Sequence, residues 1–310
     1  MNNLVEEVKA FAKQLGADLV GIAGKECFSR LPSIKPDELL PEAQSVIVIG
    51  TRRNPYVDQY RPSWNSQEHY VGNLALEMSI VLRTAAFLED KGYETVSVSY
   101  HGIFDPRGVA HKEAIRHLTI TSEGEIQGVE EFERIFWERH KFLAHMHLAV
   151  EAGLGEIGWC RQVVTPQFGP RVGFVSIITD AELLPDKKIE EPICKKAECG
   201  KCVEYCRSGA LTPNYGYNLA KCMLQMGVLP PIDSIKRKDQ EAIELHFAAM
   251  RGAVFPGMGH IGGRGSESGS GRSQAGGCGM CVIACPIGRK RYIAKPKSTT
   301  GAVSVSSELL

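Results

Sequence analysis

The sequence predicts an α/β domain followed by a smaller, cysteine-rich domain. Up to about residue 188, stretches with helical periodicity alternate with strand-like stretches, a pattern typical of a sheet covered by helices. Two similar cysteine runs then lie between Cys194 and Cys285. With 310 residues, 43% of them hydrophobic, the chain is long enough to bury two cores. We expect domains at 1–188 and 189–291, and a disordered tail at 292–310.

The predicted α/β domain opens with a helix and two strands. Apolar residues keep helical spacing over Leu4–Leu15, and a glycine ends this helix. Two short apolar runs predict strands over Ala17–Ala23 and Ser45–Thr51. An apolar stripe of helical period then predicts a longer helix over Leu74–Leu88, which stops at a Lys-Gly pair.

The remaining elements continue the alternation. Glu94–Tyr100 is a third predicted strand, Val129–Ala152 a helix with one apolar face, and Val172–Thr179 a fourth strand. In the second domain, a helical pattern surrounds Asn218–Met226. A Gly/Ser-rich loop over Gly252–Gly279 precedes the second cysteine run.

The two cysteine runs repeat one another. Each reads C-x2-C-x3-C, with Gly and Val at matching places; the first comprises Cys199, Cys202 and Cys206, and the second Cys278, Cys281 and Cys285. Cys194 and Cys222 raise the set to eight thiolates, which is what two cubane 4Fe-4S clusters require. The pattern is typical of a two-cluster bacterial ferredoxin-like domain, so we expect one-electron transfer.

The spacing assigns each cysteine to a cluster. The two sulfurs of a C-x2-C turn reach the same cluster, while the cysteine three residues further enters a helical turn and points to the other cluster. Cluster one is thus predicted to be held by Cys194, Cys199, Cys202 and Cys285, and cluster two by Cys206, Cys222, Cys278 and Cys281. Two details depart from the usual run: Cys194 stands five residues before Cys199, and Arg207 replaces the proline that follows the second run.

Other uses of the cysteines are open but less favoured. Structural zinc takes four ligands and leaves the third cysteine of each run unexplained. Disulfides need an oxidising compartment, whereas the first residues of the chain form an amphipathic helical pattern and not an export signal. We therefore expect a cytoplasmic protein in which Cys27 and Cys160 are small buried apolar residues.

A glycine stretch imitates a nucleotide-binding motif. Gly153, Gly155 and Gly158 satisfy G-x-G-x-x-G, and Asp180 lies where that fingerprint has its acidic residue. The fingerprint needs a strand before the glycines and a helix after them, but here a predicted helix precedes them and prolines follow. Nicotinamide binding is the weaker interpretation. We expect the glycines to allow close approach of the backbone to a flat ligand or a neighbouring element.

The glycine stretch is part of a larger set of motifs. Ala152-Gly-Leu-Gly-Glu-Ile-Gly158 is followed by Thr165-Pro-Gln-Phe-Gly-Pro-Arg171, and the eight cysteines end in Cys285-Pro286. Together with Leu15–Ala23 and Pro41–Gly50, these residues resemble the superfamily of epoxyqueuosine reductases and reductive dehalogenases. The resemblance extends over most of residues 1–290.

The resemblance implies a nitroreductase-like α/β domain that binds cobalamin in its base-off form, beside the ferredoxin-like domain. It implies corrin contacts from Gly153, Gly155, Gly158, Thr165, Phe168, Gly169 and Arg171. The protein it implies is an enzyme, a reductase that receives electrons from a soluble low-potential donor of the ferredoxin or flavodoxin class. Its substrate is then a small molecule, reduced by chemistry that the cofactor supplies.

The two branches of the superfamily make different demands. Epoxyqueuosine reductases place an Asp general acid before A-G-L-G and G-K-N after it. This chain instead has Arg139, His140, His145 and His147 before the motif, and Trp159-Cys160 after it. The dehalogenase branch often has A-G-L-G-E-[LIM]-G, as here, although its respiratory members carry a twin-arginine signal that this sequence lacks. A cytoplasmic, dehalogenase-like reductase is the leading hypothesis.

Charge and hydropathy narrow the possible partners. Lys plus Arg (36) equals Asp plus Glu (36), so no net positive charge favours nucleic acid. No apolar run is long enough to cross a membrane, so we expect no membrane-spanning segment in this sequence. Two alternatives stay open. One is an electron-transfer or corrinoid-reducing partner without its own tight corrin, and the other is an epoxyqueuosine reductase acting on tRNA.

The candidate proton donors follow the third predicted strand, because α/β proteins present chemistry at strand ends. Tyr100, His101 and Asp105 lie there, and Tyr70 resembles a tyrosine position of the superfamily. For each tyrosine, packing with a satisfied hydroxyl is the alternative. Arg52-Arg53, just beyond the second strand, are either corrin contacts or solvated side chains.

Overall fold

The computed structural model describes residues 2–32, 34–53, 64–98, 109–139, 143–225, 228–254 and 279–288, and the statements below concern these residues. Within them, the side chains of residues 2, 64–71, 109–111 and 249–254 are not described. The tail predicted at 292–310 lies outside the described residues.

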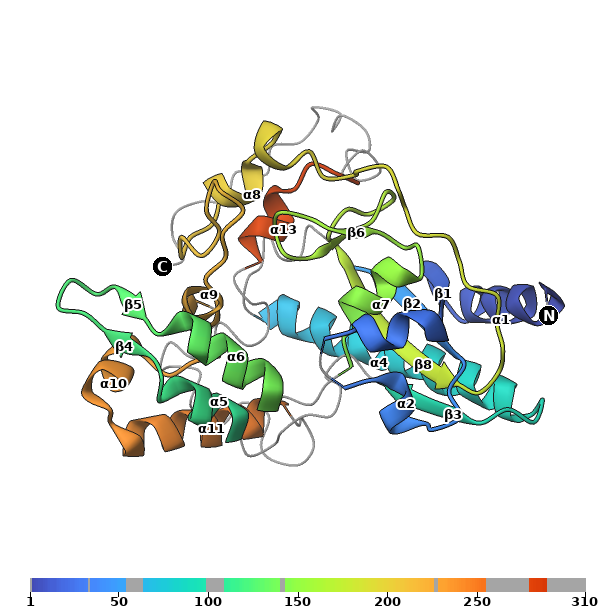
Figure 1. The fold of residues 1–310 in the computed structure, drawn as a ribbon, viewed down its shortest axis with the longest axis horizontal. Helices are drawn as coiled ribbons and strands as arrows, with labels where there is room; N and C mark the ends of the chain where they lie inside the picture. Colours follow the sequence, from blue (N-terminus) through green and yellow to red (C-terminus); the bar gives the residue numbers. More distant parts are fainter. Residues whose placement is uncertain are drawn as a thin grey trace, which may run out of the picture.

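A four-stranded sheet forms the centre of the first half of the chain (Figure 1). In spatial order its strands are β1 (Leu19–Gly24), β2 (Ser45–Arg52), β8 (Val172–Thr179) and β3 (Thr95–Val98). Every neighbouring pair is antiparallel, and Ile47 lies opposite Ile177 on the central pair. The central strands are buried along almost their whole length, which agrees with their β-branched, apolar sequences.

One face of the sheet is covered by two helices, α1 (Asn2–Gln14) and α4 (Trp64–Glu89). Their apolar stripes join Ile22, Ile47 and Ile177 in a single core. Because side chains alternate between the two faces of a strand, the residues next to these point to the other side of the sheet. Helix α1 buries its predicted stripe, whereas α4 buries Val81, Ala85 and Leu88 of its stripe and leaves Leu82 exposed.

The opposite face carries a second core, in which Val48 and Phe174 of the sheet pack with Leu148 of helix α7. The elements of this region are η1 (Lys25–Arg30), α2 (Pro36–Leu39), α7 (His145–Glu151), β6 (Glu156–Ile157) and β7 (Val163–Val164). The last two strands form a small antiparallel hairpin directly after α7. This hairpin reaches toward the cysteine-bearing elements (Figure 1).

A third core lies apart from the sheet, on the left of Figure 1. Its elements are α5 (Val109–Ile115), β4 (Thr119–Ile120), β5 (Ile126–Gln127), α6 (Val129–Arg139), α9 (Leu219–Gln225), α10 (Ile232–Arg237) and α11 (Gln240–Val254). Phe132 and Phe136 of α6 stack with ring centroids 6.0 Å apart and pack with Met223 and Phe247. This packing crosses the boundary predicted between 188 and 189, which itself stays a prediction.

The prediction of one continuous helix over Val129–Ala152 is wrong. Helix α6 ends at Arg139, and α7 begins at His145. The two helices bury their apolar residues in different cores, Phe132 in the third core and Leu148 against the sheet. A periodic pattern records that a face is apolar but not which partner it meets, so the sequence joined two helices that separate in space.

Within the described residues the other predicted helices and strands are confirmed, with ends shifted by a few residues except at α4, which begins at Trp64 and not at the predicted Leu74. The helix predicted around Asn218–Met226 is α9. The loop predicted from Gly252 is wrong at its start, because α11 continues to Val254. The mixed helix-and-sheet class is thus confirmed, with every described pair of the main sheet antiparallel. Within the described residues, no helix combines the length and hydrophobicity that a membrane crossing requires.

Replacement of Phe132 by Ala is expected to lower the free energy of unfolding by about 3–5 kcal/mol, because the fully buried ring leaves a cavity. Amide hydrogen exchange should then become faster in both 114–136 and 219–247, since these segments share the third core. The control is Leu245→Ala, exposed on α11, which should change stability by less than about 0.5 kcal/mol. Faster exchange confined to 114–136 would contradict a shared core.

Candidate functional site

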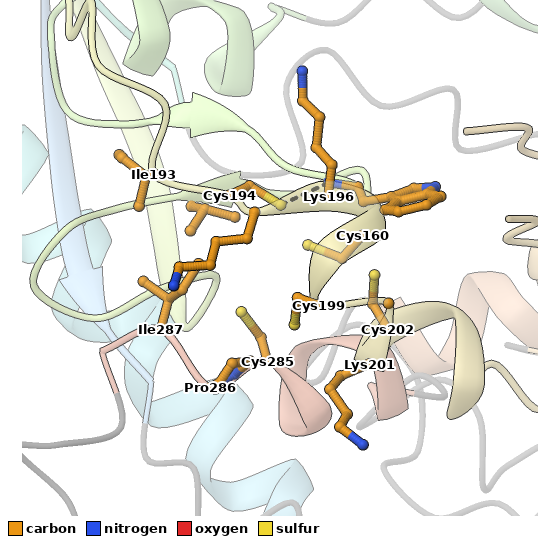
Figure 2. Close-up of a pocket in the computed structure, with 14 residues that line it drawn as sticks. Cys160, Ile193, Cys194, Lys196, Cys199, Lys201, Cys202, Cys285, Pro286 and Ile287 are labelled. Carbon is orange, nitrogen blue, oxygen red and sulfur yellow. Dashed lines mark hydrogen bonds between the residues drawn. The ribbon is translucent and has the colours of Figure 1, made fainter. Parts of the chain in front are cut away.

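Five cysteines line one cavity of about 230 Å³ beside the β6–β7 hairpin (Figure 2). They are Cys160, Cys194, Cys199, Cys202 and Cys285. Four of the five are the residues predicted to hold cluster one, and they come from both cysteine runs. The rest of the wall includes Trp159, Val164, Pro286 and Ile287, and three lysines lie around it, Lys195, Lys196 and Lys201.

The two runs have the same local geometry, as their repeated sequence indicated. Helix α8 (Lys201–Glu204) follows Gly200, and helix α13 (Met280–Ala284) follows Gly279. Both glycines have a left-handed backbone, with φ of 57° and 58° respectively. This conformation favours glycine and allows the sharp turn between the first two cysteines of each run. The two short helices contact each other, which brings the runs together.

Cys194 is fixed by the hairpin. The backbone N–H of Trp159 donates to the Cys194 sulfur at 3.5 Å. A carboxylate oxygen of Glu156 accepts hydrogen bonds from the backbone N–H groups of Cys194 and of Ile193, the latter at 2.8 Å. Glu156 lies inside the glycine stretch, and its role was missed by the sequence analysis, which took the stretch only as a glycine motif. An acidic residue between closely packed glycines was the available signal.

The four sulfurs predicted for cluster one are within electrostatic reach of one another. Burial raises the pKa of Cys202, and the nearby Cys194 and Cys285 raise it further. Burial also raises the pKa of Cys285, with added effects from Cys194 and Cys199. Thiols placed this closely do not all ionise unless a cation binds between them, because the thiolate charges repel one another. Iron ions are such cations, and they bind thiolates. The donor set therefore fits a cubane 4Fe-4S cluster, whose four protein ligands are thiolates.

The residues predicted for cluster two are described in part, because Cys278 lies outside the described residues. Burial raises the pKa of the Tyr217 hydroxyl, as do the nearby Cys222 and Cys281, which places these two cysteines beside one side chain. The Cys206 sulfur accepts a hydrogen bond from the backbone N–H of Leu211 at 3.4 Å. Burial opposes ionisation of the Cys206 thiol. The hydrogen bond from Leu211 and those from neighbouring groups outweigh the effect of burial, so the pKa of the thiol is lowered.

The two remaining cysteines differ from each other. Cys27 is buried in the core between the sheet and η1, and burial raises its pKa to about 11. Cys160 is also buried and its pKa is raised by burial, but it belongs to the cavity wall. A Cβ atom built on Gly158 would lie 3.6 Å from the sulfurs of both Cys160 and Cys194. Among the described residues, no group of three or more His, Cys, Asp or Glu side chains is placed so that it could hold a single metal ion.

The glycine stretch packs against protein backbone. Gly153 follows α7 with φ of 69°, and an added Cβ would lie 2.2 Å from the carbonyl oxygen of Lys187. A Cβ on Gly155 would lie 2.6 Å from the carbonyl oxygen of Val164, across the hairpin. Helix α7 precedes the glycines, as the sequence indicated, and the first strand of the hairpin lies between Gly155 and Gly158. The close approach is thus to neighbouring elements of the chain itself.

The second motif of the resemblance forms a tight turn. The Thr165 hydroxyl accepts from the backbone N–H of Phe168 and donates to the carbonyl of Gly169, both at 3.1 Å. Thr165 and Phe168 are buried. Arg171 is 2% exposed, and its guanidinium donates to the carbonyls of Val282 at 3.0 Å, Cys285 at 3.1 Å and Ile287. The described contacts of these residues are with protein, so their predicted contact with a corrin stays a prediction.

The side chains of the predicted proton donors all lie outside what the structure describes. Tyr100, His101 and Asp105 lie outside the described residues, as does His140. Tyr70 lies in α4, where its side chain is not described. The rule on strand ends that selected the first three is drawn from parallel α/β sheets, whereas the main sheet of this chain is antiparallel.

The other polar candidates have partners in the protein. The His145 ring lies against the sheet, with Nδ1 2.8 Å from the Ser176 hydroxyl. Arg52 pairs with Asp18 at 3.5 Å. Arg53 pairs at 3.0 Å with Glu77, a fully buried carboxyl whose pKa is raised by burial, against the opposing effects of Arg53 and Thr51. The sequence did not single out Glu77, because a lone acidic residue in a helix gives no signal of burial.

Comparisons with known proteins follow the same two branches. No protein-family model matches the chain. Tetrachloroethene reductive dehalogenase of Sulfurospirillum multivorans is 42% identical over 21% of this chain and 13% of its own length. Epoxyqueuosine reductase of Bacillus cereus is 24% identical over 71% of this chain and 55% of its own length.

Solved structures share the fold. An epoxyqueuosine reductase matches 93% of this chain and 66% of its own chain, with a TM-score of 0.54 and 17% identity. A reductive dehalogenase, whose structure is described as suggesting a mechanism for B12-dependent dehalogenation, has a TM-score of 0.51 and 16% identity. That match covers 82% of this chain and 37% of the dehalogenase. The chain thus matches less than two thirds of the length of each of these proteins.

The fold and its neighbours define a class of helix-and-sheet proteins whose relatives are reductases. Sequence matches and structural neighbours together support the superfamily of epoxyqueuosine reductases and reductive dehalogenases that the motifs indicated. The named relatives in both branches are reductases. They do not separate the two branches from each other.

Proposed function

We propose that this protein is an iron–sulfur reductase in which the two cysteine runs bind two 4Fe-4S clusters. The observation that carries the proposal is the cavity whose wall contains Cys194, Cys199, Cys202 and Cys285, drawn from both runs (Figure 2). The bound clusters would supply one-electron transfer at low potential. The protein supplies the sulfurs, the backbone N–H donors that stabilise negative sulfur, and the apolar wall that limits water.

Each cluster would be attached to a different core. Cluster one would lie against the β6–β7 hairpin and the end of the sheet, through Cys194 and Cys285. Cluster two would be held by Cys206, Cys222, Cys278 and Cys281. Of these, Cys222 lies on α9 in the helical third core. This arrangement would give the ferredoxin-like part support from both halves of the chain, although it has little apolar core of its own.

The finer proposal is a dehalogenase-like, cobalamin-dependent reductase acting on a small molecule. It rests on the resemblance of the glycine and Thr165–Arg171 motifs, and on relatives of which one is described as B12-dependent. The described residues of these motifs are engaged with protein, so they add no support for a corrin, and we derive no step through it. The proposed electron donor is a soluble protein of the ferredoxin or flavodoxin class, and the proposed location is the cytoplasm.

An epoxyqueuosine reductase is the second candidate function. It is favoured by the sequence match that covers the larger share of this chain, 71%. The third alternative is a protein that passes electrons to a corrinoid partner without binding a corrin tightly itself. All three share the iron–sulfur site, so the experiments below test that site first.

Replacement of Cys202 by Ala is expected to lower the iron content from about eight to about four per chain after anaerobic reconstitution, since cluster one loses a ligand. The chain should also become less stable, because ligand binding and folding are coupled. Metal analysis and the visible spectrum measure both clusters. Iron content equal to that of the unaltered chain would contradict the assignment of Cys202.

Two control variants accompany this measurement. Cys27→Ala alters a buried cysteine of the sheet core and should leave the iron content unchanged. Cys160→Ala should also leave it unchanged, although Cys160 lies on the cavity wall. Iron loss in Cys160→Ala would show that the ligand set is wrong.

The corrin is tested on the reconstituted chain. After anaerobic incubation with cobalamin and desalting, the base-off cob(II)alamin spectrum should remain with the protein at about one corrin per chain, since the resemblance implies base-off binding. Loss of the corrin from a chain that retains full iron would exclude tight binding and favour the electron-transfer alternative.

The tRNA branch is tested by a gel shift. With equal numbers of basic and acidic residues, the chain should not retard tRNA at physiological salt, because nucleic-acid affinity depends largely on phosphate neutralisation. Retardation at that salt concentration would favour the epoxyqueuosine reductase over the dehalogenase-like reductase.

A further inference from the structure

The strongest feature outside the ligand set is a buried arginine that contacts the second cysteine run. Arg171 stands directly before β8, and its backbone carbonyl accepts from the N–H of Arg53 at 2.8 Å, which ties it to the end of β2. Its side chain is 2% exposed. The guanidinium is therefore a positive charge held inside the protein at the point where the sheet ends.

The guanidinium reaches three carbonyls of the second run. Arg171 donates through Nη1 to Val282 at 3.0 Å and to Cys285 at 3.1 Å, and through Nη2 to Ile287. The first two of these carbonyls belong to the end of helix α13, where backbone carbonyls lack helical partners. An arginine is suited to this place because its planar fork of donors can bind several acceptors at once.

The neighbouring backbone fixes the same contact. A Cβ on Gly169 would lie 2.2 Å from the carbonyl oxygen of Ile287, and a Cβ on Gly288 would lie 2.5 Å from the backbone nitrogen of Gly169. The turn before Arg171 and the segment after Cys285 thus touch directly through backbone atoms. Arg171 cannot move away from Cys285 without separating these segments.

This geometry gives the charge an electrostatic role. Cys285 is a predicted ligand of cluster one, and the Arg171 guanidinium donates to its backbone carbonyl at 3.1 Å, so the buried positive charge lies beside this ligand. Reduction adds an electron to a cluster that is already negative, and a nearby buried cation stabilises the more negative state. Arg171 also binds the carbonyl of Val282, next to Cys281, a predicted ligand of cluster two, but its other two carbonyls belong to Cys285 itself and to Ile287. The effect should therefore be larger on cluster one than on cluster two.

We propose that Arg171 is a positioning residue that raises the reduction potential of cluster one above that of cluster two. The proposal rests on the proposed function, since it requires the clusters. Electrons entering the protein would then collect on cluster one, at the end of the sheet. Cluster two, attached to the helical core, would be the earlier carrier. The order of the two clusters would thus follow from a single side chain that is not itself a ligand.

The test is an anaerobic redox titration followed by electron paramagnetic resonance on the full reconstituted chain. In Arg171→Gln, one of the two midpoint potentials should fall, with an equilibrium constant for reduction lowered about tenfold, equal to about 59 mV for one electron. The other potential should fall by less, because Arg171 binds the residue next to Cys281 but not Cys281 itself. Arg171→Lys keeps the charge and should stay close to the unaltered protein. The matched control is Arg134→Gln, which removes an exposed cation on α6.

The outcomes separate this proposal from the proposed function. Unchanged potentials in Arg171→Gln at full iron content would overturn the role of the charge, as would an equal shift in Arg171→Lys. Iron loss in both variants would also overturn it, because Arg171 would then serve folding alone. Iron loss in the Gln variant alone would overturn it too, because the charge would then serve to retain the cluster and not to set its potential. An unaltered chain without iron would overturn the proposed function itself.

Discussion

The docking of the second cysteine run onto the end of the sheet is the contact on which the candidate site depends. Three cysteines of the cavity come from residues 194–202, but the fourth predicted ligand, Cys285, arrives from the far end of the described chain. Arg171 and the backbone contact between Gly169 and Ile287 bring it there. Both contacts use backbone carbonyls, so they constrain where the segment lies more than which side chains it carries. The Cys285 sulfur must lie beside the sulfurs of the first run before one metal cluster could bind cysteines of both runs.

The glycine stretch after α7 has a structural role in the same region. It lets the hairpin of β6 and β7 lie close to the segment 187–194, where Glu156 binds the backbone of Cys194. Trp159 then directs its N–H to the Cys194 sulfur. Motifs that the resemblance associates with a corrin thus have described contacts that shape the cysteine cavity.

The cysteines are held by two parts of the molecule, the sheet with its hairpin and the helical third core. The sheet and its hairpin hold Cys194 and Cys285, while the helical core formed by α5, α6 and α9–α11 carries Cys222. This helical core draws on residues from both sides of the predicted domain boundary, since Phe132 packs with Met223 and Phe247. The cysteine segment is therefore placed by two separate apolar units. Electron transfer between clusters attached to different units would depend on the contact of α8 with α13.

The sequence by itself indicated most of the elements and predicted a grouping of the cysteines, because both inferences use local rules. Helical and strand periods report which faces are apolar, and C-x2-C-x3-C reports which sulfurs share a turn. The tertiary structure alone decided that Val129–Ala152 divides between two cores, that the sheet is antiparallel, and that Arg171 and Glu156 bind backbone near the cysteines. These features depend on partners distant in the chain. A local pattern carries no information on distant partners, since the same apolar face or buried charge can meet any of several neighbours.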